Sequence, residues 1–333
     1  MKKLLYLFYY LKQLDRAKYI SFLNYASSKH NLDKTKLAID SFISVIKYNI
    51  SLLEYFQFRF YELSPAERLK WAGTGFMYEY QLKMNPKNKR DILDDKRKFY
   101  KNYKNFIKHS IADISDFQNG SGIREKIFNN KSGKVVLKVY DGKCGRDVLI
   151  KPLTEFDNGD LVRYMKKNNY DLAEEYVVQH PSLMKLSPSG LNTLRVITQL
   201  NNNNEVEILG VRLRITINSE VDNLAAGNIA APVNIETGKV AGPGVYSDIT
   251  KDDVYKHPVT GVDIVGFEVP YFKESIRLAT DAAKFNTSNR SIGWDIAITE
   301  DGPELIEGNH DWCKLLWQLP VKKGLKQVLE KYL

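Results

Sequence analysis

The stretch IGWDIAITEDGPELIEGNHDW, residues 292–312, decides the fold that we expect for this chain. Two apolar runs in it flank an Asp-Gly dipeptide, which is a strong signal for a β-hairpin. Asp295 belongs to the first run. Glu307 and Asn309 belong to the second and, being two residues apart, point to the same face of their strand. Either these are polar residues beside a turn, or they converge on a metal ion.

The register of the hairpin decides between these alternatives. If Glu300 pairs with Glu304 across a three-residue loop, Asp295 falls opposite Asn309, and the three oxygen-bearing side chains share one patch. Pro303, which has no N–H for a ladder, then lies in the loop. A two-residue turn would instead place Asp295 on the opposite face and break the site. The metal hypothesis therefore depends on the three-residue loop.

Two carboxylates and an amide suit Mg²⁺, which keeps water molecules and substrate phosphates in its remaining positions. Without a cation, two carboxylates this close would repel one another or take up a proton. Softer metal sites are not indicated, because Cys144 and Cys313 form no CxxC motif and the five histidines form no HExxH motif. We predict a magnesium site formed by Asp295, Glu307 and Asn309.

The composition is that of a folded protein with about two domains. Of its 333 residues, 43% are hydrophobic and 27% are charged, which is enough for sizeable cores and excludes a disordered chain. Two cysteines suit a reducing cytoplasm. The apolar stretch at residues 4–11 is too short to span a bilayer, and we interpret it as a buried or an interfacial first helix.

Basic residues are concentrated in the first third of the chain. Residues 1–110 contain 22 Lys and Arg against 10 Asp and Glu, whereas the remainder contains 27 against 30. A basic, aromatic-rich lobe suits an anionic membrane surface or an acidic polysaccharide, and an ordinary solvated face is the alternative. Nucleic acid is not expected, because no nucleic-acid motif is present. We expect a cytoplasmic protein, with peripheral attachment at the inner face of the membrane left open.

Hydrophobic periodicity divides the chain near residue 110. Residues 1–110 read as helices: Asp33 can cap one, Ser64 to Glu67 form a capping box with proline at the first helical position, and residues 91–109 are a long amphipathic run. From about residue 133, short β-branched runs are broken by Gly, Asn and Asp, with helical segments between them. This pattern of short strands with helices between them predicts an α+β fold in which helices pack on sheets.

The hairpin and the blocks around it resemble the sugar-transfer-associated branch of the ATP-grasp superfamily. The D-x₁₁-E-x-N spacing of the three candidate ligands matches the superfamily's metal motif. The resemblance covers roughly residues 50 to 320 and includes, in the expected order, FRFYELSPAER, EEYVVQHPSL, LSPSGLNTLRVIT, VDNLAAGNIAAPVNIETG, HPVTG and WCKLLWQLP.

The resemblance implies the ATP-grasp fold, in which two α+β lobes clasp ATP. We expect this domain at residues 111–333, with a glycine-loop lobe at about 120–178 and a metal-site lobe at about 179–333. A basic, mainly helical region, residues 1–110, would precede it.

A phosphate-binding element is implied in KVVLKVYDGKCGRDVLIKP. ATP-grasp proteins cover the triphosphate with a flexible glycine hairpin and place a strand lysine on its oxygens. We assign that lysine to Lys138 and the hairpin to Gly142 and Gly145, because glycine lets backbone N–H groups approach a polyanion. Lys151 is a second candidate on the same sheet. The superfamily's other, earlier lysine has no clear counterpart, and Lys108 is a weak candidate.

EEYVV, residues 174–178, resembles the hinge between the lobes, where backbone groups read the adenine edge. The cofactor-binding candidates are Glu174, Glu175, Tyr176 and Val177. For either glutamate, a salt-bridged strand end is the alternative.

Three arginines lie inside apolar strands, where a charge is costly unless it is paired. Each either pairs with a buried carboxylate or faces a phosphate or a substrate carboxylate. We favour a catalytic role for Arg195, and for Arg214 over Arg212 because it lies nearer to the family's arginine before VDN. The candidate substrate residues in VDNLAAGN, which a plain loop would also explain, are Asp222, Asn223 and Asn228.

The activity implied by the resemblance is ATP-dependent joining of a carboxylate to an amine through an acylphosphate. ATP and Mg²⁺, one ion or two, are the expected cofactors, with Lys138, Arg195 and Arg214 orienting the transferring group. The family's gene neighbours suggest a uronic-acid sugar of a surface polysaccharide joined to an amino acid or other amine, so the partner would be a small molecule or glycan. The alternatives are a phosphotransferase acting on a sugar hydroxyl and a non-enzymatic binding protein.

Overall fold

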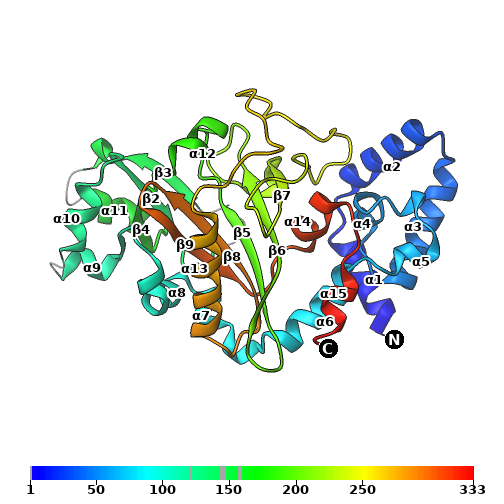
Figure 1. Ribbon diagram of the computed structural model, residues 1–333, viewed down its shortest axis with the longest axis horizontal. Helices are drawn as coiled ribbons and strands as arrows, with labels where there is room; N and C mark the ends of the chain where they lie inside the picture. Colours follow the sequence, from blue (N-terminus) through cyan, green and yellow to red (C-terminus); the bar gives the residue numbers. More distant parts are fainter. Residues whose placement is uncertain (1, 120–121, 143–147, 157–159) are drawn as a thin grey trace.

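The computed structural model describes residues 2–119, 122–142, 148–156 and 160–333. The strands in these ranges form two antiparallel sheets. Sheet A has the strand order β1-β4-β2-β3, and sheet B has the order β7-β6-β5-β8-β9. Helices fill the N-terminal third and cover the sheets (Figure 1). The predicted α+β class and the helical N-terminal region are confirmed.

The strands of sheet A are β1 (Ile111–Asp113), β2 (Lys134–Lys138), β3 (Val148–Pro152) and β4 (Leu172–Glu175). Those of sheet B are β5 (Leu194–Leu200), β6 (Val206–Ile215), β7 (Ile229–Val233), β8 (Ser291–Thr299) and β9 (Gly302–Asn309). The helices before sheet A are α1 (Lys2–Lys12), α2 (Arg16–His30), α3 (Lys34–Tyr48), α4 (Leu52–Gln57), α5 (Pro65–Arg68), α6 (Thr74–Met84), α7 (Asp91–Asp94) and α8 (Lys96–Tyr103). The later helices are α9 (Ile114–Gln118), α10 (Ile123–Phe128), α11 (Asp160–Lys167), α12 (Pro181–Leu186), α13 (Phe272–Phe285), α14 (Lys314–Gln318) and α15 (Lys326–Glu330).

Side-chain caps fix several helix starts in the N-terminal region. Asp33 accepts a hydrogen bond from the third N–H of α3, and Ser64 forms a capping box with Glu67 at the start of α5. The run at residues 91–109 is not one continuous helix. Asp95 has extended backbone and accepts from the N–H groups of Arg97 and Lys98 in the first turn of α8, so it ends α7 and begins a new helix.

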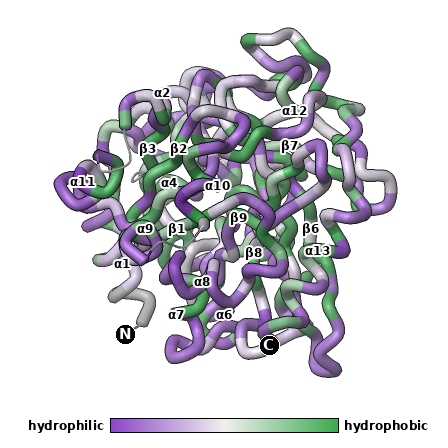
Figure 2. The backbone as a smooth tube through the Cα atoms, turned by 90° about the vertical axis from the view of Figure 1, so that its left-hand side faces the viewer, coloured by the Kyte–Doolittle hydropathy of each residue, from purple (hydrophilic) through white to green (hydrophobic). Residues whose placement is uncertain are grey.

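Sheet B has one apolar face and one polar face. Val196, Leu213, Trp294 and Ile296 lie in the main hydrophobic core, together with buried residues of α13. Because successive strand residues point to opposite faces, the residues between them face the other way. The charged side chains of the candidate site therefore share the second face. Figure 2 shows hydrophobic colour along β2, β3 and β6 and hydrophilic colour on α8 and α11.

The N-terminal helices are built into the rest of the molecule. The side chain of Gln318 on α14 bonds both the N–H and the carbonyl of Ala72, at 2.9 and 3.0 Å. Buried Glu54 on α4 pairs with Lys314 Nζ on α14 at 2.8 Å. In Figure 1, α14 and α15 lie beside the N-terminal helices. No helix among the described residues is long and apolar enough to cross a membrane.

Candidate functional site

The β8–β9 hairpin closes through a two-residue turn, since Thr299 pairs with Gly302. The predicted three-residue loop was therefore wrong, and so was the prediction that a two-residue turn breaks the site. A β-bulge that leaves Ile306 unpaired shifts the ladder, so Asp295 lies opposite Glu307. Gly302 has a φ of +95°, which explains why glycine follows the turn.

One row of charged side chains crosses the polar face of sheet B. The strand register pairs Arg212 with Arg195, Arg195 with Asp295, and Asp295 with Glu307. Asn309 adjoins the acidic end of this row: its Nδ2 lies 3.1 Å from Glu307 Oε1 and 3.5 Å from Asp295 Oδ2. The structure thus brings the three candidate metal ligands together.

Two arginines hold Asp295. Its Oδ1 accepts from Arg195 Nε at 2.5 Å, and its Oδ2 accepts from Arg195 Nη2 and from Arg214 Nη1, each at 2.7 Å. Burial alone would raise the pKa of Asp295, but the two guanidinium groups outweigh it and hold the pKa well below its usual range. This carboxylate therefore stays ionised, and the same contact fixes both candidate catalytic arginines.

Glu307 has a different environment. Burial raises its pKa, and the negative charge of Asp295 raises it further. A bound cation would relieve this repulsion. Carboxylate oxygens and an amide oxygen are donors that fit Mg²⁺, so the residues present fit the predicted ion. Among the described residues, no group of three His, Cys, Asp or Glu side chains offers another metal site.

A cleft between the two sheets opens at the acidic end of the charged row, where Asp295 and Glu307 line it. Its volume is about 170 Å³. Sheet A contributes an apolar wall of Val136, Val148 and Ile150, and sheet B contributes Asp295 and Glu307. An apolar wall beside converging charges suits a ligand with a flat ring and a charged tail.

Lys138, the predicted phosphate lysine, lines the cleft, and its Nζ lies 2.5 Å from Glu174 Oε2. Glu174 also accepts from Tyr100 Oη at 2.7 Å. Burial alone would raise the pKa of Glu174, but Lys138 and His109 lower it to about 2. The side chain of Glu174 therefore holds Lys138 in a salt bridge. This is the alternative interpretation that the sequence left open for Glu174.

The remaining hinge candidates lie where the chain leaves sheet A. Glu175, Tyr176 and Val177 all line the cleft. The side chain of Glu175 accepts from Ser110 N at 3.2 Å, so its carboxylate also has a structural partner. Beyond β4 the chain runs along the cleft through Tyr176 and Val177.

Lys96, at the start of α8, was missed by the sequence reasoning. It lines the cleft, and its Nζ donates to the carbonyl of Gly142. Burial lowers the pKa of Lys96, while Glu307 opposes that shift. Its signal in the sequence was weak, because it is one of many lysines and is distinguished only by following the cap residue Asp95.

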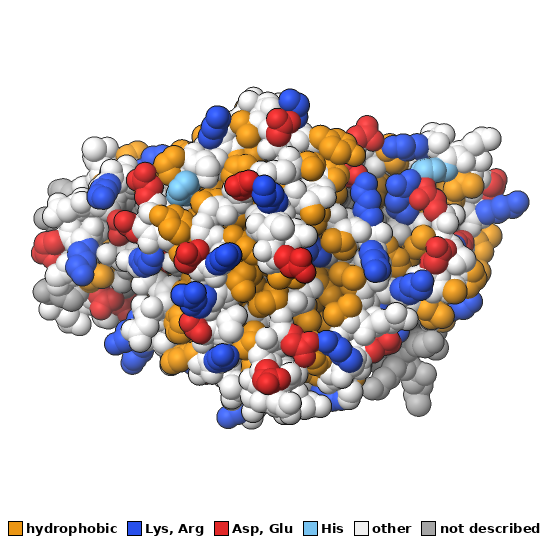
Figure 3. All heavy atoms as spheres, viewed as in Figure 1, with side chains coloured by type: hydrophobic (Ala, Val, Ile, Leu, Met, Phe, Trp, Pro, Cys, Tyr) orange, Lys and Arg blue, Asp and Glu red, His pale blue; other side chains and the backbone are white. Residues whose placement is uncertain are grey.

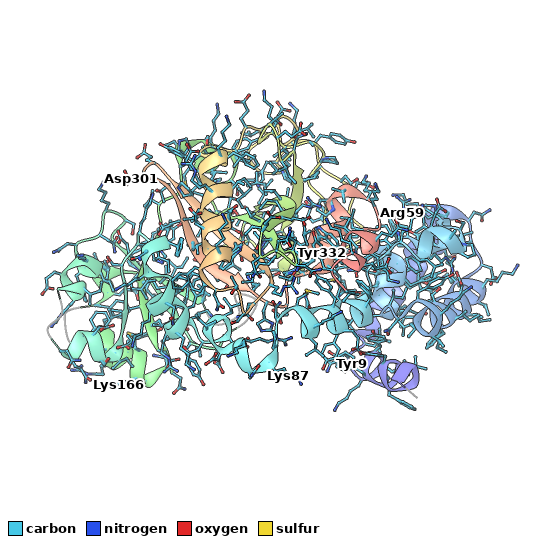
Figure 4. The ribbon with its side chains drawn as sticks, turned by 60° about the horizontal axis from the view of Figure 1, so that its bottom comes forward. Tyr9, Arg59, Lys87, Lys166, Asp301 and Tyr332 are labelled. Atoms are coloured by element: carbon cyan, nitrogen blue, oxygen red, sulfur yellow. The ribbon has the colours of Figure 1, made fainter. Side chains whose placement is uncertain are left out.

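Two other lysine candidates lie outside the cleft lining. Lys151 pairs with Glu155 Oε2 at 2.7 Å. Lys108 donates to the carbonyl of Asp301 at 2.5 Å, at the tip of the β8–β9 hairpin, where Figure 4 labels Asp301. Gly142 lines the cleft, whereas Gly145 lies outside the described residues.

The VDNLAAGN segment, residues 221–228, holds Arg214 through an ion pair. Asp222 Oδ1 pairs with Arg214 Nη2 at 2.7 Å, and Asp222 also lines the cleft. Asn223 lines the cleft as well. Asn228 is buried, accepts from Ile217 N at 2.7 Å and is not part of the cleft lining, so its role here is to hold the loop. Arg212 donates to the carbonyl of Trp317, and burial lowers its pKa to about 10.

Residues 76–332 match the sugar-transfer associated ATP-grasp family, and the chain belongs to that family. No curated protein matches the chain.

Among solved structures, a biotin carboxylase complex from Campylobacter jejuni is 13% identical, with a TM-score of 0.43 over 73% of this chain and 47% of that one. A putative ATP-grasp superfamily protein from Archaeoglobus fulgidus is 13% identical, with a TM-score of 0.37 over 72% and 53%. An L-amino acid ligase from Bacillus licheniformis is 13% identical, with a TM-score of 0.36 over 66% and 41%. The chain thus spans about half the length of these structures.

Proposed function

We propose that this chain is an ATP-dependent ligase that joins a carboxylate to an amine through an acylphosphate, with a uronic-acid-type sugar of a surface polysaccharide and an amino acid or other amine as substrates. The observation that carries the proposal is the acidic end of the charged row, Asp295 and Glu307, which lines the cleft together with Lys96 and Lys138 on its other walls. Family membership supports the use of ATP.

The row suits phosphoryl transfer because its charges are arranged in advance. In the first step an oxygen of the substrate carboxylate attacks the γ-phosphorus, the bond to the β-phosphate oxygen breaks, and ADP leaves. Lys96, Lys138 and Arg214 line the cleft where negative charge would move. Fixed cations at such a place stabilise a transition state without reorganising.

In the second step the amine nitrogen attacks the acyl carbon, the bond from that carbon to the phosphate oxygen breaks, and inorganic phosphate leaves. The nitrogen also loses a proton. Mg²⁺ held by Asp295, Glu307 and Asn309 would neutralise phosphate charge when bound. The chain's own contribution is to orient the carboxylate through arginines that Asp295 keeps in place.

Isotope transfer tests the proposal directly. Purified protein is incubated with Mg²⁺, ATP, an amine mixture and a panel of ¹⁸O-labelled sugar carboxylates, and the products are analysed by mass spectrometry. The expected result is ADP, with one ¹⁸O atom carried from the carboxylate into phosphate. Hydroxylamine in place of the amine should yield a hydroxamate. Release of AMP, or unlabelled phosphate with an amide formed, would contradict the acylphosphate route, and a phosphorylated sugar formed without amine would indicate a phosphotransferase.

A further inference from the structure

A second cavity joins the cleft at the acidic end of the charged row. Its volume is about 440 Å³, within the range of small-molecule sites. The residues that line both spaces are Lys96, Gly142, Arg214, Asn223 and Glu307. A molecule in the second cavity would therefore meet a nucleotide in the cleft at Glu307.

We infer that this second cavity is the carboxylate subsite and that the N-terminal helices form its outer wall. The inference rests on the proposed function and adds the place and the chemistry of the substrate. The wall residues from α2, α4 and α6 are Lys18, Leu53, Glu54, Gln57 and Thr74. These residues precede the family match, which begins at residue 76.

The lining fits a hydroxyl-rich carboxylic acid. Near the junction, Lys96, Arg195 and Arg214 line the cavity, and such cations attract a carboxylate. Asn223 at the junction and Gln57 farther out add uncharged amide side chains, a kind of group that forms hydrogen bonds with hydroxyl groups.

The wall is held firmly against the catalytic half of the molecule. Lys314 is partly buried beside Glu54; burial alone would lower its pKa, but Glu54 raises it. Gln57 Nε2 donates to the carbonyl of Ser247 at 2.9 Å. The helices are therefore positioned to complete the cavity.

Cys313 provides a reporter, because it is exposed and lines this cavity. The full chain is alkylated with N-ethylmaleimide, in parallel with Cys313→Ser, which retains Cys144. We expect alkylation of Cys313 to raise the KM for the sugar carboxylate at least tenfold while the Kd for Mg²⁺-ATP changes less than twofold. Alkylation should have no such effect on Cys313→Ser. D-glucuronate, D-galacturonate and UDP-glucuronate should each be tested for slowing the labelling of Cys313.

Two results would overturn the inference. An unchanged KM after complete alkylation would place the carboxylate elsewhere. Labelling that none of the three acids slows would reject the substrate class. Failure of the proposed function looks different: the acids would protect Cys313, yet no ¹⁸O would reach phosphate.

An independent observation concerns the outer face of α3. Ile39, Phe42, Ile43 and Ile46 follow one another at helical spacing and are 40–56% exposed. Four large apolar side chains on one exposed helix face are uncommon on the surfaces of soluble proteins. We call these four residues the α3 stripe.

The exposed charged side chains within α3 itself are all positive. The exposed residues of α3 besides the stripe are Lys34, Thr35, Lys36 and Lys47, and the helix's single carboxylate, Asp40, pairs with Arg68 at 2.7 Å. Exposed Phe8 and Tyr9 lie on α1, and Figure 4 labels Tyr9 at the outer edge of the molecule. In Figure 3, many Lys and Arg side chains lie over the N-terminal helices at the right, with Asp and Glu side chains among them.

We propose that the α3 stripe docks on an anionic lipid bilayer. Apolar side chains that enter the interface, surrounded by lysines that attract acidic headgroups, are the features of an interfacial helix. A hydrated acidic polysaccharide would use the lysines but not the apolar side chains. This proposal does not depend on the chemistry of the cleft.

Vesicle flotation tests the proposal with the full chain. We expect binding to vesicles of phosphatidylglycerol and phosphatidylcholine, weakened by salt, and none to phosphatidylcholine alone. Ile39→Gln combined with Ile43→Gln should reduce binding at least tenfold. The matched control, Tyr255→Gln combined with Val259→Gln, alters exposed apolar side chains in a different region and should leave it unchanged.

The proposal fails if the wild-type chain does not float with anionic vesicles or if the α3 double variant floats equally well. It also fails if light scattering shows a dimer that the double variant abolishes, because the stripe would then be covered by a second copy of the chain.

Discussion

Asp295 lies directly opposite Glu307 across the β8–β9 ladder, yet the two carboxylates have opposite electrostatic environments. Arg195 and Arg214 hold the pKa of Asp295 below its usual range, whereas burial and the charge of Asp295 raise that of Glu307. One carboxylate is thus already neutralised by the protein, and the other still favours an added cation. This asymmetry leads to the first two predictions.

Glu307→Gln should remove nucleotide turnover and leave the fold intact. The amide keeps the shape of the side chain but loses the charge that a cation needs, so we expect turnover to fall by about two orders of magnitude or more, the scale of losing one strong electrostatic contact. Steady-state ADP release measures the effect. Glu300→Gln, on the exposed turn of the same hairpin, is the control and should retain full turnover. Normal turnover by Glu307→Gln would show that the site is misplaced.

Asp295→Asn should instead destabilise the protein. It leaves Arg195 and Arg214 buried without their shared carboxylate, and breaking a buried ion pair from one side costs about 3–5 kcal/mol. Glu307→Gln removes a carboxylate that burial disfavours, so its free energy of unfolding should stay within about 1 kcal/mol of wild type. Urea denaturation of both variants measures the difference. Equal loss of stability would contradict the assigned asymmetry.

Lys96→Ala should weaken ATP binding about tenfold or more, because it removes a cation that lines both the cleft and the second cavity. Lys101→Ala, on the exposed side of the same helix, controls for the loss of one positive charge and should bind ATP normally. Lys108→Ala and Lys151→Ala should also bind normally, since neither residue lines the cleft. Isothermal titration with Mg²⁺-ATP measures all four variants. Loss of binding in Lys151→Ala alone would favour the other face of sheet A.

The sequence identified the three candidate metal ligands but did not predict the strand register that brings them together. Spacing showed that Glu307 and Asn309 share a face, and the motif linked them to Asp295. The strand alternation of Leu305, Ile306 and Glu307 is broken by two adjacent apolar residues, which is the trace of the bulge in the sequence. That signal alone does not fix the strand register. A hairpin turn of a different length can place the same side chains on the same face of the sheet.

The sequence also could not predict which residues pair with the buried charged side chains. The strand arginines were predicted to pair with a carboxylate or to face a ligand, and the structure shows pairing that still leaves Arg195 and Arg214 lining cavities. Glu174 and Lys138 are 36 residues apart, and their contact depends on β2 pairing with β4. Such contacts follow from sheet order, which local periodicity does not specify.

A pH-dependent contact links the two sheets. His109 Nδ1 lies 2.7 Å from Glu304 on β9, and its Nε2 lies 3.6 Å from Glu174 on β4. Burial alone would lower the pKa of His109, but the two glutamates raise it to about 9. Because this folded-state pKa exceeds the model-peptide value of 6.5, the charged histidine stabilises the native state below about pH 6.5, and this contribution is lost as the pH rises through 9.

We therefore expect the free energy of unfolding to fall between pH 6.5 and 9 by an amount on the order of 2–3 kcal/mol, the scale set by a shift of this size. His109→Gln should be less stable at neutral pH and should lack the slope. His30→Gln, in the N-terminal helices, should keep it. Urea denaturation at several pH values measures the slopes. A wild-type slope that persists in His109→Gln would place the titrating group elsewhere, and the link between Glu174 and Glu304 would then not depend on a charged histidine.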